Sequence, residues 1–323
     1  MSNSNQLEMM ERIALDLEGV ERALASSFNT GSEDFNTLIR PLSEAGGKRL
    51  RAQLCLLIAN AGTSVEEERI KIAEAVEMLH LATLIHDDVL DQAEIRRGEE
   101  TIHKHKGNKV AILSGDYLFA KAFRIVSEMP HMEYLKIFSH IITCLVEGEF
   151  MQMEDVYRID QGIDRYMTKT QKKTADFMEG CMELGGLLGG WSSDEIMYLK
   201  RYGHALGMAF QITDDIMDYR ETSDTTGKPV GNDLREGLLT YPLLSIVNES
   251  NQNQLLQDIK NLNHGGNEQE IIDYVIAQGG IDNTLRVTQQ YCDDALSALQ
   301  SIRDFDGKEF LVLAVQNLAD RKV

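Results

Sequence analysis

Two near-identical acidic pentapeptides, each inside a strongly apolar helical stretch, constrain this chain more than any other feature. The first is Asp87–Asp91 (DDVLD) and the second is Asp214–Asp218 (DDIMD). Three ionised acids on adjoining faces of one helix repel one another, and a carboxylate that loses its hydration is costly unless a cation compensates it. Two such clusters that face each other would hold divalent metal. We therefore expect a fold that brings two acid-bearing helices together.

Helical character extends along the whole chain. Only four prolines occur in 323 residues, and the long segments between turn signals repeat their apolar residues with a period of about 3.6. No segment has the composition of a long flexible linker, so the sequence predicts a single all-α domain. Breaks between helices are expected at residues 29–33, 61–64, 98–107, 128–131, 192–193, 222–231 and 263–267.

Composition argues against several classes of protein. The hydrophobic content of 43% is that of a globular protein, and the formal charge of -20 argues against a nucleic-acid partner. The four cysteines show no CxxC or zinc spacing, which is typical of free thiols in a reducing cytosol. The N-terminus lacks a signal-peptide pattern, and the apolar runs are shorter than the roughly 18 residues of a membrane span. The sequence thus predicts a cytoplasmic protein without a stable membrane anchor.

The helix that carries the first acidic motif is predicted to be long. Residues 64–67 (SVEE) fit a capping box, and neither proline nor glycine follows until beyond Ala93. At about 1.5 Å per residue, this stretch would span roughly 45 Å. Helical spacing places Asp87 on one face with Thr83 and His80, so that one stripe of this helix is polar.

A second helix, from about Tyr202 to Arg220, repeats the arrangement. Its polar stripe consists of Gly207, Gln211, Asp214 and Asp218. A single DDxxD motif near a helix end often only faces water, but a pair favours metal binding. Magnesium takes oxygen ligands in near-octahedral geometry, commonly one or two carboxylates together with phosphate oxygens. An EF-hand would need alternating acids and a glycine turn on a loop, which neither motif has.

Basic clusters spaced around the acidic motifs indicate what the metals hold. They are Gly46–Arg51 (GGKRLR), Arg96–Gly98 (RRG), Lys172–Thr174 (KKT) and Thr226–Lys228 (TGK). Each cluster alone is weak evidence, because basic pairs commonly extend from a surface into water. Together they indicate diphosphate binding, in which arginine grips oxygens bidentately and lysine acts as a point charge. The sequence contains no glycine motif of the nucleotide-binding folds.

These motifs together resemble the trans-prenyl diphosphate synthases, which extend an allylic diphosphate with isopentenyl diphosphate. The match runs from about Gly46 to Pro242 and includes GGKRLR, HLATLIHDDVLD, RRG, GDYL, KT, FQITDDIMD and GKPVGNDL in the family's order. The resemblance implies an all-α isoprenoid synthase fold, a single helical bundle around a deep central cavity with the acidic motifs facing each other at its mouth. It also implies one synthase domain over residues 1–323, with an N-terminal helical segment at 1–30 and a motif-bearing core at about 46–242.

The resemblance assigns roles position by position. It implies Mg²⁺ ligands, for three ions held with bound diphosphate, at Asp87, Asp88, Asp91, Asp214, Asp215 and Asp218. It implies contacts to the allylic diphosphate from Arg96, Lys173 and Lys228, and contacts to isopentenyl diphosphate from Lys48, Arg51, His80 and Arg97. The oxygens of Thr174 and Gln211 would lie near the developing carbocation. With Lys173 and the six aspartates, they form the expected catalytic set.

Product length is expected to depend on the first motif's helix, one turn before Asp87. Short-chain relatives place bulky aromatic residues there, whereas this chain has Ala82 and Thr83, with Leu79 and Val76 deeper. Small residues would leave the tunnel open, so the resemblance implies a product of about C30 to C45 from a farnesyl or geranylgeranyl primer. Heptaprenyl diphosphate for a quinone side chain is the best single expectation. In the alternative interpretation, these residues only pack against a neighbouring helix.

Departures from the family pattern leave other interpretations open. Leu238 stands where many relatives have lysine, and Ala52 stands where proline is common. The segment around Leu238 is more variable in catalytic large subunits that need a small regulatory partner, so both a heterodimer of that kind and a homodimer are expected alternatives. A short-chain synthase (C15 to C20) is another. A terpene cyclase is disfavoured, because Asp218 and Thr222 occupy the serine and glutamate positions of its second metal motif.

Overall fold

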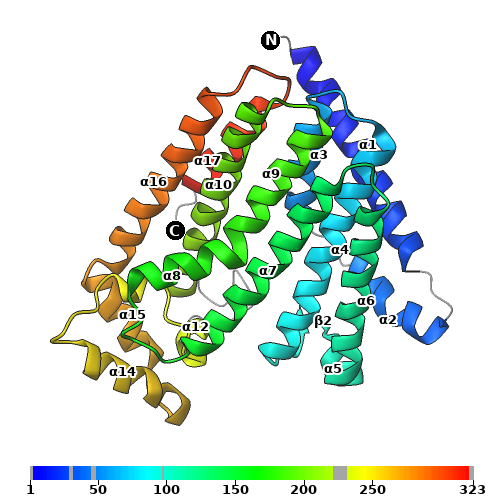
Figure 1. Ribbon diagram of the computed structural model, residues 1–323. Coiled ribbons are helices and arrows are strands. Elements are labelled where there is room, and N and C mark those ends of the chain that lie inside the picture. Colours follow the sequence, from blue (N-terminus) through cyan, green and yellow to red (C-terminus); the bar gives the residue numbers. More distant parts are fainter. Residues whose placement is uncertain (1–2, 29–31, 45–48, 97, 221–230, 320–323) are drawn as a thin grey trace. The chain divides into compact units, whose positions relative to one another are not determined.

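Helices form nearly all of the regular structure. The computed structural model describes residues 3–28, 32–44, 49–96, 98–220 and 231–319 (Figure 1). Within these ranges, the one exception to helix is a two-stranded antiparallel hairpin. The predicted all-α class is therefore confirmed. The chain divides into two compact units, the first made of Met1–Ser139, Gly180–Met197 and Asp304–Gly307, and the second of His140–Glu179, Tyr198–Arg303 and Lys308–Val323.

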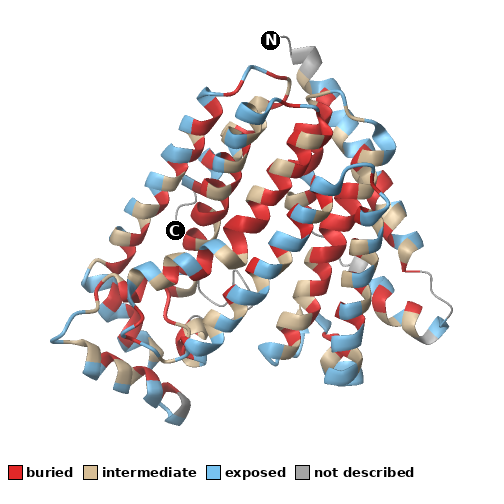
Figure 2. Ribbon diagram, in the orientation of Figure 1, coloured by how far each residue is buried: buried red, intermediate tan, exposed pale blue. Residues whose placement is uncertain are grey.

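The first unit is organised around one buried helix, α4 (Glu66–Leu90), which carries the first acidic motif. It packs against α1 (Asn3–Ser27), α3 (Leu50–Asn60) and α6 (Asn108–Ser127), and Figure 1 shows α6 running beside it. The middle of α4 is buried on nearly every face, as Figure 2 shows in red, and most of its buried side chains are apolar, with Glu74 and Glu77 as exceptions. The unit's other elements are α2 (Glu33–Glu44), β1 (Ile95–Arg96), β2 (Glu99–Glu100) and α5 (Ile102–Lys106).

Both ends of α4 differ from the prediction. The Ser64 hydroxyl donates to the Ala59 carbonyl at 2.6 Å, so no capping box forms, and the N-cap residue Val65 makes no side-chain cap. At the other end, Gln92 adopts a left-handed backbone (φ 51°), and the Ala93 N–H bonds the Asp88 carbonyl at 3.0 Å. This left-handed turn ends the helix at Leu90, short of the predicted Ala93.

Some of the predicted breaks contain regular structure. Residues 98–107 include β2 and α5, which begins after Thr101, whose hydroxyl accepts the Lys104 N–H. The breaks at 61–64 and 128–131 do separate successive helices. Most of 222–231 and of 29–33 lies outside the described residues.

The second unit contains the second acidic motif, on α10 (Ser193–Arg220). Helices α7 (Met132–Glu154), α9 (Asp176–Leu188) and α10 contribute residues to both units. The remaining elements are α8 (Gly162–Thr170), η1 (Gln171–Ala175), α12 (Asn232–Glu236), α13 (Tyr241–Leu244), α14 (Gln252–Asn261), η2 (Leu262–His264), α15 (Glu268–Ala277), α16 (Gly280–Gln300) and α17 (Lys308–Ala319). The core of this unit gathers buried side chains of α10, α12, α13, α14 and α15.

Helix α10 begins earlier than the predicted Tyr202. Its start is a capping box: the Ser192 hydroxyl accepts the Glu195 N–H at 3.3 Å, and the Glu195 carboxylate accepts the Ser192 N–H at 3.2 Å. None of the helices in the described ranges is both long and apolar enough to cross a membrane.

Candidate active site

The first acidic motif occupies the last turn of α4 and pairs with a cation that the sequence analysis also singled out. Asp88 is buried, with 6% of its surface exposed, whereas Asp87 is half-buried and Asp91 is exposed. The Arg96 Nε atom donates to the Asp88 carboxylate at 2.6 Å. Such a short, charge-assisted contact compensates the buried acid. The structure thus brings together an expected metal ligand and an expected diphosphate contact.

The residues expected at the isopentenyl diphosphate site are placed in part. The Arg51 Nη1 atom lies 3.4 Å from the His80 Nε2 atom, so α3 and α4 bring these two side chains together. The Thr83 hydroxyl donates to the His80 carbonyl at 2.7 Å within α4. Lys48 and Arg97, also expected at this site, lie outside the described residues, as does Lys228, which was expected at the allylic diphosphate.

In the second motif, the three aspartates have different environments. Asp214 is exposed, whereas Asp215 is buried and accepts hydrogen bonds from the Tyr166 hydroxyl and from the Gln211 amide, the latter at 3.0 Å. Burial raises the pKa of Asp215 to about 7, and the neighbouring Asp214 charge adds to this effect. A nearby cation would return such a carboxyl group to its ionised form, so this residue suits a site that holds divalent metal.

Asp218 makes main-chain contacts through both carboxylate oxygens. One oxygen accepts the Asn232 N–H at 3.0 Å and the other accepts the Asp233 N–H at 3.1 Å. Burial and the charges of Asp218 and Asp215 raise the pKa of Asp233 well above its usual range. Asp218 thus orients the start of α12. Asp233 is an additional acid at this site; it belongs to the GKPVGNDL motif, but the sequence analysis predicted no role for it.

The donor chemistry of both motifs fits magnesium bound together with a ligand. All six side chains offer carboxylate oxygens, the donors that this ion prefers. Among the described residues, no three carboxylates of either motif converge closely enough to hold an ion without further ligands. Magnesium usually completes its octahedron with water and phosphate oxygens, so these ligands would have to complete a site at either motif.

A π-helical turn positions the next part of the site. In η1 the Thr174 hydroxyl donates to the Gln211 side-chain carbonyl at 2.9 Å, and Gln211 in turn donates to Asp215. Gly207 allows α10 to approach this turn, because a Cβ atom there would lie 2.6 Å from the Ala175 Cα atom. Isolated π-turns of this kind are frequent at functional sites. The chain of contacts fixes the orientation of the Gln211 amide.

Several residues near η1 were missed by the sequence analysis. One is Glu149, which pairs at 2.6 Å with the expected residue Lys173, and another is Tyr166, which donates a hydrogen bond to Asp215. Lys169 is buried, with 7% of its surface exposed, and burial lowers its pKa. Lys169 lies four residues before Lys173 in one helical segment, and this spacing could have identified Lys169 from the sequence. Tyr166 and Glu149 have no comparable signal, because their partners come from distant segments.

The four residues expected to control product length lie on one side of α4. Val76, Leu79 and Ala82 are fully buried, and Thr83 is half-buried. A cavity of about 870 Å³ in the first unit is lined by the adjacent face of α4, including Leu81, Leu84 and Ile85. The role of Ala82 and Thr83 therefore stays a prediction.

Comparisons with known proteins identify the family of this chain. The sequence profile of the polyprenyl synthetase family matches residues 32–278. Octaprenyl diphosphate synthase of Escherichia coli (strain K12) is 32% identical, over 95% of this chain and 96% of that protein. Heptaprenyl diphosphate synthase component 2 of Geobacillus stearothermophilus is 32% identical, over 89% of this chain and 90% of that protein. The crystal structure of heptaprenyl diphosphate synthase from Staphylococcus aureus superposes with a TM-score of 0.88 at 28% identity, covering 96% of this chain and 99% of that chain.

The chain therefore belongs to the polyprenyl synthetase family, a family of prenyltransferases with the all-α isoprenoid synthase fold.

Proposed function

We propose that this protein is a magnesium-dependent, medium- or long-chain trans-polyprenyl diphosphate synthase. It adds isopentenyl diphosphate repeatedly to farnesyl or geranylgeranyl diphosphate and releases a product of about C30 to C45. The observation that carries the proposal is that both acidic motifs are intact and each lies beside basic residues. Arg96 pairs with Asp88 in the first motif, and the buried Lys169 acts electrostatically on Asp215 in the second. The names of the similar synthases, octaprenyl and heptaprenyl, support the chain length.

The roles of the side chains follow from the charge that develops in the reaction. The allylic C–O bond breaks, the isopentenyl double bond forms a C–C bond to the allylic carbon, and a proton leaves to the released diphosphate. When bound, magnesium neutralises the negative charge of the departing diphosphate. Arg96, Lys173 and Lys228 hold the allylic diphosphate, and the isopentenyl diphosphate is held by Lys48, Arg51, His80 and Arg97.

The contacts around Gln211 support its proposed role beside the developing carbocation. Gln211 accepts from Thr174 and donates to Asp215, so its amide cannot flip without losing both hydrogen bonds. The oxygens of Thr174 and Gln211 are therefore oriented in advance of the reaction, which is the property that makes such dipoles effective.

Assembly, product fate and location are part of the same proposal. Residues 1–323 form one synthase domain that acts in the cytoplasm as a homodimer, or as a heterodimer with a small regulatory subunit. One of the relatives is itself named as a component 2, which supports the second arrangement. The product supplies a quinone side chain.

The test is incorporation of labelled isopentenyl diphosphate into an extractable lipid by the purified protein with farnesyl diphosphate. We expect incorporation with Mg²⁺, none with excess chelator, and a loss of about 100-fold or more in Asp87→Asn and Asp214→Asn. Absence of incorporation by the protein alone and with a small regulatory subunit would refute the proposal.

A further inference from the structure

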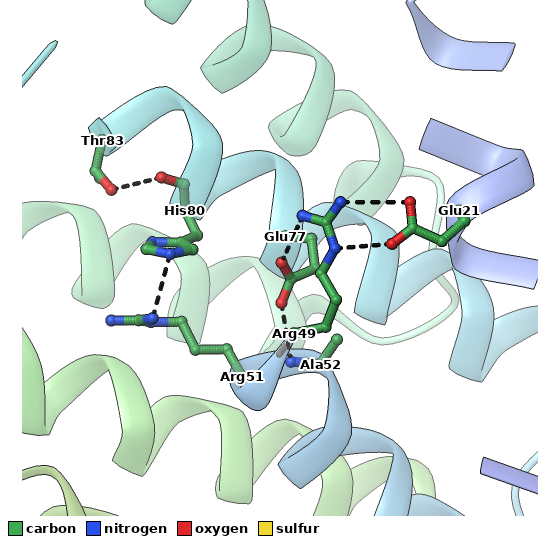
Figure 3. A network of polar contacts seen from close by, with 7 residues as sticks. All are labelled: Glu21, Arg49, Arg51, Ala52, Glu77, His80 and Thr83. Carbon is green, nitrogen blue, oxygen red and sulfur yellow. Dashed lines mark hydrogen bonds and ion pairs between the residues drawn. The ribbon is translucent and has the colours of Figure 1, made fainter. Parts of the chain in front are cut away.

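We propose that Arg49 is a positioning residue for isopentenyl diphosphate, because it engages the buried carboxylate of Glu77 and so keeps Arg51 directed to the substrate. This inference rests on the proposed function, in which Arg51 and His80 contact that diphosphate. Arg49 itself points away from His80, toward α1 (Figure 3). It therefore acts on the substrate site only through its neighbours.

Arg49 joins two acids from different helices. Its Nε and Nη2 atoms donate to the Glu21 carboxylate at 2.8 and 3.3 Å, and its Nη1 atom donates to Glu77 at 3.3 Å. Only 7% of the Arg49 side chain and 2% of the Glu77 side chain are exposed. The second Glu77 oxygen accepts the Ala52 N–H at 3.2 Å. Ala52 stands where many relatives have proline, which lacks this N–H, so the contact depends on a departure from the family pattern.

The backbone at Arg49 separates the two arginines. Arg49 has φ 45° and ψ 37°, a left-handed conformation that is unfavourable for a residue other than glycine. Such a conformation persists where surrounding contacts fix it, and here the two carboxylates do so. In Figure 3 the Arg49 side chain extends toward Glu21, whereas Arg51 extends toward His80 on the other side.

We expect Glu77 to compete for Arg51 when Arg49 is absent, because Arg51 contacts His80, a close neighbour of Glu77 on α4. Glu77 and His80 are three residues apart on α4, so they occupy neighbouring positions on its surface. Burial lowers the pKa of the Arg51 guanidinium, and the Glu77 charge opposes this shift. Without Arg49, the buried Glu77 carboxylate would lose its ion pair and attract Arg51. A diphosphate would then have to compete with Glu77 for the same guanidinium.

The test measures Michaelis constants separately for the two substrates in Arg49→Gln, Glu77→Gln and the double variant. In Arg49→Gln we expect the KM for isopentenyl diphosphate to rise about tenfold, the equivalent of one charge-assisted hydrogen bond, while kcat and the KM for farnesyl diphosphate change less than about twofold. The double variant should recover the KM for isopentenyl diphosphate to within about threefold, because the competing charge is gone.

Arg69→Gln is the matched control. Arg69 is also a buried arginine, and its Nε atom lies 2.9 Å from the Asp16 carboxylate. This ion pair joins α4 to α1, the two helices that Arg49 also connects. Removing this ion pair should lower the thermal midpoint without changing the ratio of the two Michaelis constants. If Arg49 only joined the helices, Arg49→Gln would behave in the same way.

Three results would overturn the inference: an equal change in both Michaelis constants in Arg49→Gln, no recovery in the double variant, or a tenfold increase in Glu77→Gln alone. The last variant keeps the Arg49–Glu21 pair and stays informative if Arg49→Gln does not fold. Failure of the proposed function is distinguishable, because the wild-type protein would then incorporate no isopentenyl diphosphate.

Discussion

The Nε atom of Arg96 donates a 2.6 Å hydrogen bond to the carboxylate of Asp88, eight residues earlier in the chain. Asp88 is buried, whereas Asp87 and Asp91 of the same motif are more exposed. The pair thus separates the roles of three aspartates that look equivalent in the sequence. We therefore propose that Asp88 orients Arg96, the expected diphosphate contact, and that the more exposed Asp87 and Asp91 are the ones that reach metal.

This separation predicts different defects for two similar substitutions. Asp88→Asn should raise the KM for the allylic diphosphate about tenfold, because Arg96 loses a charge-assisted partner. Asp87→Asn should instead raise the Mg²⁺ concentration needed for half-maximal activity. Activity titrations with each component measure both effects. An equal shift in Mg²⁺ requirement for the two variants would show that Asp88 is also a direct ligand.

Product length should respond to Thr83 and not to the adjacent face of α4. Thr83→Phe places an aromatic ring one turn before Asp87 and should shorten the main product toward C20. Leu84→Phe is the control, since Leu84 lines the neighbouring cavity, and it should leave the product unchanged. Chromatography of the dephosphorylated products compares the two. Shortening by Leu84→Phe alone would place the growing chain in that cavity.

Tyr166→Phe should destabilise the protein because it removes the hydroxyl that donates to buried Asp215. Hydrogen bonds to charged groups contribute about 1.5–3 kcal/mol, so this loss is expected above about pH 7, where Asp215 is ionised. Tyr157→Phe removes a neutral bond to the Arg235 carbonyl at 3.1 Å and should cost less, about 1 kcal/mol. Denaturant unfolding gives both free energies. Equal losses of unfolding free energy in the two variants would show that the hydrogen bond to Asp215 is no stronger than a neutral one.

The buried Glu74 predicts a pH-dependent gain in stability on substitution. Burial raises the pKa of Glu74 above its usual 4.5, although the Ser27 hydroxyl donates to it at 2.6 Å. The folded state therefore holds this proton more tightly, and the wild-type protein loses stability as the pH rises through the folded pKa. Glu74→Gln should match the wild type near pH 4 and exceed it at pH 7 to 8, by about 1 kcal/mol.

Glu67 is the comparison, because its pKa is shifted in the opposite direction to that of Glu74. Glu67 is exposed and pairs with Lys71 at 2.7 Å, which lowers its pKa. Its contribution is present above the unfolded pKa and is lost at lower pH, so Glu67→Gln should not stabilise the protein at any pH. Urea unfolding of both variants at several pH values tests the pair. A gain in Glu67→Gln equal to that in Glu74→Gln would contradict the role of burial.

Sequence patterns predicted what is local and repeated, and missed what depends on tertiary contacts. The 3.6-residue period gave the helices, because an apolar face must be buried. The predicted capping box at Ser64 does not form, because the Ser64 hydroxyl donates to the Ala59 carbonyl. An equivalent pattern at Ser192 does cap a helix. The Asp88–Arg96 pair depends on the turn that follows Leu90. The network of Arg49, Glu21 and Glu77 joins three segments distant in sequence, so no motif could reveal it.

The size of the product made by the purified protein distinguishes a long-chain from a short-chain synthase. The protein would be incubated with Mg²⁺, farnesyl diphosphate and labelled isopentenyl diphosphate, with and without a small regulatory subunit, and the dephosphorylated products would be sized by chromatography. We predict a ladder that ends between C30 and C45. A main product of C20 or shorter under both conditions would contradict the assignment of a medium- or long-chain synthase.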